Sequence, residues 1–429
     1  MEITEELLYF IWKFRYYDFQ HLVTADGEKL EIVHPGFRNE DAGPDFSQAK
    51  IKIDDTLWAG SVEIHIMASE WQSHKHQLDP AYNNVTLHVV WKKDAMTLNE
   101  AGVEIPCLEL YDRVDSSMIR QYDFLMKNEK WVPCADQIHT TPDLVKKNWL
   151  QRLMAERLAS KSASILVALK HQKEDWQSVA YQKLARALGT QVNGEAMEML
   201  ARICPLSIIG KHKDQLLQIE ALLFGQSGIL PTAHSEQEYL NKLRLEYDFL
   251  KNKYTLIPMQ RVQWKFLRMR PTNFPTIRIA QLARLLFQSQ HLFSKLIAAE
   301  EVKEIIHLLD VTVSHYWKDH FTFDTEASSP KEKRLGKLSI HTIVINTVCP
   351  LLFAYGLSTD DEKYKEKALR FLSELPAEVN AITRSWAALG VQADSAMDSQ
   401  ALIQLKNNFC NEKKCLYCSI GHQLLKQTK

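Results

Sequence analysis

The residues with the clearest chemical potential are an aspartate and, one predicted hairpin later, a glutamate and a histidine. Asp45 follows Gly43 and Pro44 just ahead of one predicted strand, and Glu63 and His65 alternate on the next strand. If these strands are neighbours, the three side chains converge at one edge of a sheet. Two carboxylates held together bind Mg²⁺ or Mn²⁺ through oxygen, and such a metal activates water and stabilises the charge of a phosphate under attack. The pattern therefore predicts a divalent-metal nuclease site.

A histidine-rich connection follows the second strand. His74, His76 and Asp79 are close enough in sequence to bind a metal, or to contact a scissile phosphate beside Asp45 and Glu63. On a helix, positions 74 and 76 would not share a face, so this interpretation requires a loop or the use of one histidine. The plainer interpretation is a hydrophilic connection with one capping aspartate.

Three cysteines gather near the C-terminus in the pattern Cys410-x4-Cys415-x2-Cys418, followed by His422. Thiolates are soft ligands for zinc or for an iron–sulfur cluster. With His422 as the fourth ligand, the pattern predicts a Cys₃His zinc site. With a distant cysteine, it predicts a [4Fe–4S] cluster instead, and the candidates are Cys134, Cys204 and Cys349. The alternative is three uncoordinated cysteines.

Residues 249–299 contain no acidic residue, nine Lys and Arg residues and several interleaved aromatics. Clustered positive charge attracts phosphate, and aromatic faces stack on unpaired bases. The stretch therefore predicts nucleic-acid binding, with DNA favoured over RNA, through Lys265, Arg268, Arg270, Arg278 and Arg284. Alternatively, the aromatics belong to the core and the arginines pair with acids elsewhere.

The length and composition indicate the class of protein in which these motifs occur. A chain of 429 residues with 45% hydrophobic and 24% charged residues is typical of a protein with two or more ordinary globular domains. Up to residue 135 there are 13 Lys and Arg against 23 Asp and Glu, and after it there are 39 against 30. Neither a P-loop nor a Gly-x-Gly-x-x-Gly motif occurs, so neither ATP nor a dinucleotide is implied.

The N-terminus has no basic segment followed by an apolar run, and seven cysteines in such a chain indicate reduced thiols. A cytoplasmic protein with no membrane contact is therefore predicted. The longest apolar stretch, residues 338–356, contains a histidine, an asparagine and a proline, which favours a buried helix over a membrane span.

The periodicity of the hydrophobic residues changes near residue 135. Before it, Thr4 can cap a helix that runs to about Tyr16, and alternation predicts strands at 31–34, 46–53, 57–67 and 85–91, with a helical or irregular connection at 69–82. After it, a period near 3.6 predicts helices at 143–170, 176–188, 214–224, 236–252, 277–288, 339–355, 361–372 and 399–409. We therefore expect an α+β domain over residues 1–135 and an all-α domain over 136–429, which carries the basic segment 249–299 and the Cys-rich end 410–422.

This element order, with Pro44-Asp45 followed by Glu63-x-His65, resembles the PD-(D/E)XK nuclease superfamily over about the first hundred residues. The resemblance implies a restriction-endonuclease-like fold, a mixed sheet flanked by helices. That family usually has lysine at the position of His65, and a glutamate in its first helix, for which Glu6 is the candidate. Some mismatch-repair endonucleases of the superfamily carry a similar Trp-His-x-His segment after the catalytic strand. Certain recombination-type exonucleases of the superfamily hold their nuclease domain together with one early and three late cysteines.

The chain as a whole is also similar to a bacterial family whose function is unknown. The resulting hypothesis is metal-dependent hydrolysis of phosphodiester bonds in DNA or RNA. Asp45 and Glu63 would hold Mg²⁺ or Mn²⁺, His65 would orient the water, and His74 or His76 would contact phosphate. The alternatives are a catalytically inactive scaffold of the same fold that grips nucleic acid or protein, and a metal-dependent hydrolase with another substrate. The sequence leaves the oligomeric state open.

Overall fold

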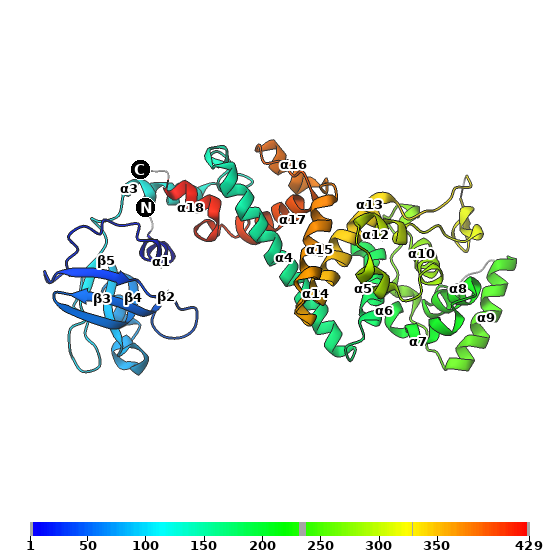
Figure 1. The fold of residues 1–429 in the computed structure, drawn as a ribbon, viewed down its shortest axis with the longest axis horizontal. Coiled ribbons are helices and arrows are strands. Elements are labelled where there is room, and N and C mark those ends of the chain that lie inside the picture. The colour runs from blue at the N-terminus through cyan, green and yellow to red at the C-terminus, as the bar shows by residue number, and fades with distance from the viewer. Residues whose placement is uncertain (1–2, 231–236, 328, 427–429) are drawn as a thin grey trace. The chain divides into compact units, whose positions relative to one another are not determined.

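The computed structural model describes residues 3–230, 237–327 and 329–426 (Figure 1). Internal contacts divide the chain into a sheet unit, residues 1–149 and 405–429, and a helical unit, residues 150–404. The sequence predicted a single boundary near residue 135. The structure instead returns the last part of the chain to the first unit, so the Cys-rich end folds with the sheet.

The sheet unit contains a mixed sheet with the strand order β1-β3-β4-β5-β6, in which β2 also pairs with β3. β1 and β3 are antiparallel, as are β3 and β4, whereas β4 and β5 are parallel, as are β5 and β6. The strands are β1 Leu30–His34, β2 Phe37–Arg38, β3 Phe46–Ile53, β4 Thr56–Met67, β5 Val85–Lys92 and β6 Cys107–Glu109. The predicted mixed sheet with flanking helices is confirmed at this level.

The first helix covers part of this sheet. α1, Glu5–Phe14, begins at Thr4, whose side chain accepts a hydrogen bond from the Leu7 N–H as predicted for an N-cap. Its apolar face, with Leu8 and Ile11, is fully buried, and the helix packs on β4. On β3, alternation buries Ala49, Ile51 and Ile53 and leaves Lys50 and Lys52 between them accessible.

The connection between β4 and β5 contains little regular structure. It holds a single turn, α2 Glu70–Ser73, and two 3₁₀ turns, His76–Leu78 and Pro80–Tyr82. Trp71 anchors it, because its ring is 1% exposed and its indole N–H donates to the Leu98 carbonyl at 2.9 Å. The fully helical connection that would have separated positions 74 and 76 is therefore absent from this described segment.

The last part of the chain packs against the segment that follows the sheet. The elements are α3 Ser116–Lys127, the 3₁₀ turn Ile138–Thr140, the start of α4 Asp143–His171, the π-helical turn Lys406–Cys410, the 3₁₀ turn Cys415–Tyr417 and α18 Ser419–Lys426. The Lys406 ammonium donates to the Trp131 carbonyl at 2.6 Å, and the rings of Trp149 and Phe409 pack edge to face. These contacts join residues almost 300 positions apart.

The helical unit consists mainly of α-helices, as predicted. Its helices include α5 Trp176–Leu188, α6 Thr190–Ile203, α7 Leu206–Ile209, α8 Leu216–Gln226, α9 Glu238–Tyr254, α10 Pro275–Gln288, α11 Leu292–Ala298, α12 Val302–Leu309, α15 Glu362–Glu374, α16 Ala381–Ala388 and α17 Ala396–Leu405. A small hairpin is formed by β7 His320–Thr322 and β8 Thr325–Glu326. The expected helix at 236–252 corresponds to α9, and position 236 lies outside the described residues. The sequence did not predict α6, α11, α12 or α16.

The apolar stretch predicted to be buried forms a helix with a distortion. It consists of α13 Lys337–Ile343, a π-helical turn Val344–Val348 and α14 Cys349–Thr359. By length and composition, residues 337–359 are the one helix among the described residues that could cross a membrane. Because 72% of its apolar window is buried inside the protein, it serves as a core helix here, as the sequence predicted.

Candidate metal centre

The β3–β4 pairing places Asp45 and Glu63 side by side. Phe46 pairs with Val62, and the backbone N–H of Asp45 donates to Glu63 Oε2 at 2.9 Å. Glu63 is only 5% exposed, so its carboxylate lies inside the protein although it is on a strand. The structure thus brings the two carboxylates together as the hairpin argument expected.

The two carboxylates nevertheless differ in what they offer. Asp45 Oδ1 forms an ion pair with the Arg38 guanidinium at 2.8 Å, and Asp45 Oδ2 accepts the Ile64 N–H at 3.0 Å. Both of its oxygens are therefore engaged by the protein. Glu63 Oε1 instead faces the histidine-rich connection, and it is the oxygen available to a metal.

Three imidazoles lie beside that oxygen. Ligand atoms of His65, His74 and His76 all lie within 4.8 Å of one another. His65 Nε2 lies 3.2 Å from His74 Nδ1, and Glu63 Oε1 lies 3.6 Å from His65 Nε2 and 3.3 Å from His76 Nε2. The three histidines thus form one group of nitrogen donors, and Glu63 contacts two of them.

The irregular connection makes this convergence possible. Lys75 adopts a left-handed conformation with φ 63°, which reverses the chain between His74 and His76. The His76 ring then stacks on Tyr82 with centroids 3.9 Å apart and meets the buried Trp71. On a helix, two histidines two positions apart would point in different directions. This segment is a turn and not a continuous helix, so that argument does not apply.

A second layer orients His65. Its Nδ1 lies 2.8 Å from His88 Nε2, and His88 Nδ1 lies 2.9 Å from the Thr97 hydroxyl. His65 and His88 are 2% and 0% exposed. If Nδ1–H donates along this chain toward Thr97, His65 Nε2 keeps its lone pair toward the site, which is the arrangement that outer-layer partners of metal-bound histidines provide. The roles of His88 and Thr97 could not be predicted from their spacing in the sequence.

The electrostatics describe a site prepared for a cation. Burial, together with the neighbouring Asp45, raises the pKa of Glu63 to about 8. Burial and the surrounding imidazoles lower the pKa of His65 to about 2, and burial lowers that of His76 to about 4. His65 and His76 are therefore neutral and ready to act as ligands, and a divalent cation would favour the ionised Glu63.

Glu6, the expected contribution of the first helix, lies elsewhere. Its carboxylate accepts a hydrogen bond from the Tyr417 hydroxyl. The preceding residue, Glu5, faces the site instead: its carboxylate accepts from the Tyr9 hydroxyl at 3.2 Å, and its pKa is raised by burial and by Asp45 and Glu70. The sequence prediction named the wrong one of two adjacent glutamates, because the rotation of a helix about its axis depends on packing.

The C-terminal cysteines form a second cluster, joined by Cys134. The thiols of Cys134, Cys410, Cys415 and Cys418 interact electrostatically, and burial and this proximity raise the pKa of Cys134 and of Cys415 to about 12. The two other candidates for a distant fourth ligand, Cys204 and Cys349, are fully buried within the helical unit.

The surroundings of Cys418 and His422 distinguish the two possible fourth ligands. The Cys418 sulfur accepts hydrogen bonds from the Ile420 and Gly421 N–H groups and from Trp149. The His422 ring instead hydrogen-bonds through Nε2 to the Tyr16 hydroxyl and packs against the rings of Phe10 and Phe14. The geometry thus favours Cys134 over His422.

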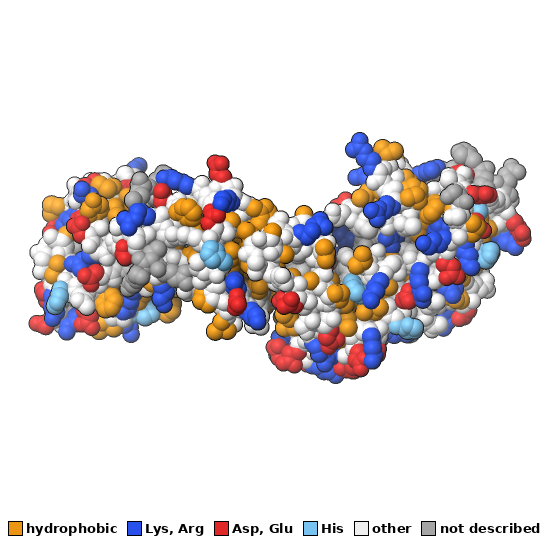
Figure 2. Space-filling view, turned by 90° about the horizontal axis from the view of Figure 1, so that it is seen from above, with side chains coloured by type: hydrophobic (Ala, Val, Ile, Leu, Met, Phe, Trp, Pro, Cys, Tyr) orange, Lys and Arg blue, Asp and Glu red, His pale blue; other side chains and the backbone are white. Residues whose placement is uncertain are grey.

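The five basic residues predicted to bind nucleic acid do not share one surface. Lys265, Arg268 and Arg270 are exposed, and Arg284 is half-buried. Arg278 is only 5% exposed and lines an internal cavity. Among the interleaved aromatics, Trp264 belongs to the core and donates to the Ser227 carbonyl. Figure 2 shows Lys and Arg side chains scattered over the helical unit with other side chains between them.

The comparisons with known proteins place the chain in a family. The family model described as "Protein of unknown function (DUF2851)" matches residues 5–381, so the chain belongs to that family. No curated protein and no solved structure matches it. The resemblance to a family of unknown function is therefore confirmed, and that family assigns no activity.

Proposed function

We propose that the sheet unit is a metal-dependent hydrolase that cleaves phosphodiester bonds in DNA or RNA. The observation that carries the proposal is the group of ring nitrogens of His65, His74 and His76, with Glu63 Oε1 beside two of them, His65 and His76. The order of elements supports it: a helix, three antiparallel strands and a parallel strand, with Asp45 and Glu63 on adjacent strands, follow the PD-(D/E)XK pattern.

The donor set fits a transition metal better than Mg²⁺. Imidazoles suit Zn²⁺, Fe²⁺ and related ions, whereas Mg²⁺ prefers oxygen. His76 Nε2 is buried and has no hydrogen-bond partner. A buried nitrogen without a partner is suited to binding a metal. Glu63 and the three histidines would hold the ion, in place of the predicted pair Asp45 and Glu63. The ion would lower the pKa of a bound water and stabilise phosphate charge.

The surrounding residues would position a substrate. His74 is exposed whereas His65 is buried, so the cluster opens to solvent on the His74 side. Arg38 is held by Asp45, lies over the Tyr9 ring and keeps 26% of its side chain exposed, so its guanidinium is available to a phosphate. The exposed Lys265, Arg268 and Arg270 would add attraction for a polyanion.

The inactive scaffold remains the second candidate. The observation in its favour is that both oxygens of Asp45 are already engaged, by Arg38 and by the Ile64 N–H. A nuclease that relies on two metal-bound carboxylates would have to release one of these contacts.

The deciding experiment measures bound metal and cleavage together. We expect purified protein to bind one Zn²⁺, Mn²⁺ or Fe²⁺ per sheet unit and to cut labelled DNA or RNA. His76→Ala and Glu63→Gln should abolish both properties, because each removes one of four ligands. His139→Gln, which alters an exposed histidine of the same unit, should change neither. Metal binding without cleavage of any single- or double-stranded substrate would favour the scaffold, and the absence of metal binding would contradict the hydrolase.

We also propose that Cys134, Cys410, Cys415 and Cys418 hold a zinc ion or an iron–sulfur cluster that fixes the end of the chain to the sheet unit. The hydrogen bonds to the Cys418 sulfur support it, since such donors stabilise a metal-bound thiolate. Cys134→Ser should remove this metal and lower the melting temperature, because structural metal binding is folding free energy. Cys204→Ser should leave the metal content unchanged. Loss of metal in His422→Ala but not in Cys134→Ser would restore the Cys₃His alternative.

A further inference from the structure

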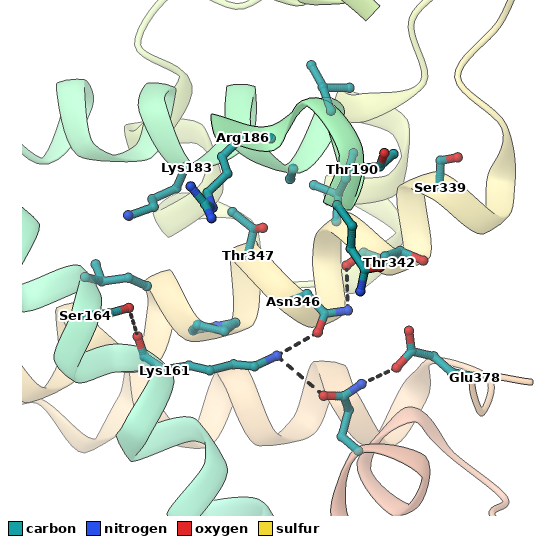
Figure 3. A pocket seen from close by; sticks show the side chains of 18 of the residues that line it. Lys161, Ser164, Lys183, Arg186, Thr190, Ser339, Thr342, Asn346, Thr347 and Glu378 are labelled. Atoms are coloured by element: carbon teal, nitrogen blue, oxygen red, sulfur yellow. Dashed lines mark hydrogen bonds between the residues drawn. The ribbon is translucent and has the colours of Figure 1, made fainter. Parts of the chain in front are cut away.

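The helical unit contains a large, partly open cavity in which basic and polar side chains lie beside aliphatic ones. Its volume is about 1020 Å³, large enough for a small organic ligand. Five Lys and Arg residues line it against two glutamates, Glu195 and Glu378. The basic residues come from three helices and are Arg157, Lys161, Lys183, Arg186 and Arg278. Figure 3 shows Lys161 reaching from α4 toward Asn346 and the side chains of Lys183 and Arg186 extending into the same space.

The hydrogen-bond partners of Lys161 and Arg157 are neutral amides. Lys161 Nζ donates to Asn346 Oδ1 at 2.6 Å and to Gln400 Oε1 at 3.5 Å. Arg157 Nε donates to the same Gln400 oxygen at 2.7 Å. The other end of this amide donates to Glu378, so that carboxylate meets the two cations through an uncharged group (Figure 3). An amide satisfies the hydrogen bonds of these cations but does not neutralise their charge.

Arg278 is a third buried cation with the same kind of partners. Its guanidinium donates to Gln281 Oε1 at 2.9 Å and Asn273 Oδ1 at 2.7 Å, while its Nε is buried without a hydrogen-bond partner. Only 5% of the residue is exposed. A buried N–H group without an acceptor costs free energy, and it indicates that an acceptor is missing at this place.

On α5, positive charge also exceeds negative charge. Lys183 and Arg186 both bind the Glu198 carboxylate, at 3.2 and 2.8 Å, and Arg202 binds it at 3.1 Å. Three cations thus share one carboxylate. Burial also lowers the pKa of Lys161 to about 8, and desolvation of this kind is the expected result of holding cations together without counterions.

We propose that this cavity binds a phosphorylated small molecule, with the phosphoryl group among Lys161, Arg157 and Arg186. Phosphate supplies the negative charge that the amide partners of Lys161 and Arg157 do not, and guanidinium groups bind it with two parallel hydrogen bonds. The site is separate from the proposed metal centre, because every lining residue belongs to the helical unit.

The rest of the lining indicates the kind of organic group. Hydroxyls of Thr190, Ser339, Thr342 and Thr347 face the cavity beside aliphatic side chains such as Ile165 and Ile343. Among the described residues that line it, none is aromatic, so a flat base would find no ring on which to stack. A sugar phosphate or another phosphorylated polyol therefore matches the lining better than a nucleotide does.

The test is direct binding measured by calorimetry and thermal denaturation on the full chain. The probes are glucose 6-phosphate, fructose 1,6-bisphosphate, AMP and inorganic phosphate, with glucose as the uncharged control. We expect saturable binding of a sugar phosphate, at least tenfold tighter than AMP or phosphate and absent for glucose. Lys161→Met should weaken it at least tenfold, and Arg186→Gln, which alters a more exposed residue and preserves the fold, should weaken it by a similar factor. Lys170→Met, an exposed lysine on the same helix, should have no effect.

Three results would overturn the proposal. The first is the absence of binding for every phosphate compound. The second is binding that Lys161→Met and Arg186→Gln leave unchanged, which would place the ligand elsewhere. The third is AMP binding as tight as that of the sugar phosphates, which would reject the polyol.

Discussion

The histidine–carboxylate cluster of the sheet unit and the cationic cavity of the helical unit bury titratable groups in opposite ways. The cluster places a carboxyl group beside His65 and His76, whose imidazoles are neutral at physiological pH, so these two residues bring no positive charge. The cavity holds cations whose partners are amides, so it lacks negative charge. The charge that each site lacks indicates its ligand. The cluster would bind a metal cation, and the cavity would bind a phosphorylated molecule.

The two sites also differ in how the chain assembles them. Asp45, Glu63 and His65 lie within one hairpin, and His74 and His76 lie in the next connection, so their proximity follows from local structure. The cavity takes Lys161, Arg186 and Arg278 from helices far apart in sequence. A local motif can be recognised from spacing, whereas a cavity between helices cannot.

The largest stability effect should come from Glu63. In metal-free protein its pKa of about 8 exceeds the ordinary 4.5, so the folded state holds a proton that the unfolded state releases. Stability should therefore fall as pH rises from about 4.5 to 8. At pH 8, Glu63→Gln should remove this penalty and raise the free energy of unfolding on the order of 3 kcal/mol, while it abolishes metal binding.

Urea denaturation of chelator-treated protein between pH 5 and 8 measures this effect. Glu31→Gln, an exposed glutamate on β1, is the matched control and should leave the pH profile unchanged. A wild-type profile that is flat over this range would show that Glu63 is ionised without a metal, and the metal-centred interpretation would lose its electrostatic support.

Lys161 should show the opposite pH dependence with a smaller amplitude. Its folded pKa of about 8 lies below the ordinary 10.5, so the unfolded state binds more protons between these values. Stability should rise as pH increases from about 8 to 10.5. The charged groups that bear on it are Arg157, which lowers its pKa, and Glu378 and Cys349, which raise it. At pH 7, Lys161→Met should therefore stabilise the free protein, by about 1 to 3 kcal/mol.

The measurement is the melting temperature of ligand-free protein at pH 7 and pH 10. A purely structural lysine would give the reverse result, a loss of stability in Lys161→Met at pH 7. Lys170→Met should match the wild type at both pH values.

The sequence predicted the local parts of the molecule and failed on the long-range parts. Alternation and capping placed α1, β3, β4 and β5 closely, because those signals depend on neighbouring residues. The domain boundary was misplaced because the contacts of the last 25 residues with the sheet unit involve partners hundreds of positions away. Glu5, His88 and the choice of Cys134 were missed for the same reason: each is specified by which surfaces pack together.

The smallest effect concerns the exposed basic residues, and it tests whether the two units act on one ligand. If nucleic acid contacts Arg268 and Arg270, its affinity should fall as salt rises, with each neutralised phosphate contributing about 0.7 to 0.9 to the logarithmic slope. Arg268→Gln combined with Arg270→Gln should flatten that slope by about 1.4 to 1.8 and weaken all sequences alike. Arg384→Gln, an exposed arginine outside the basic stretch, is the control. An unchanged slope in the double variant would confine nucleic-acid contacts to the sheet unit, where Arg38 is held by Asp45.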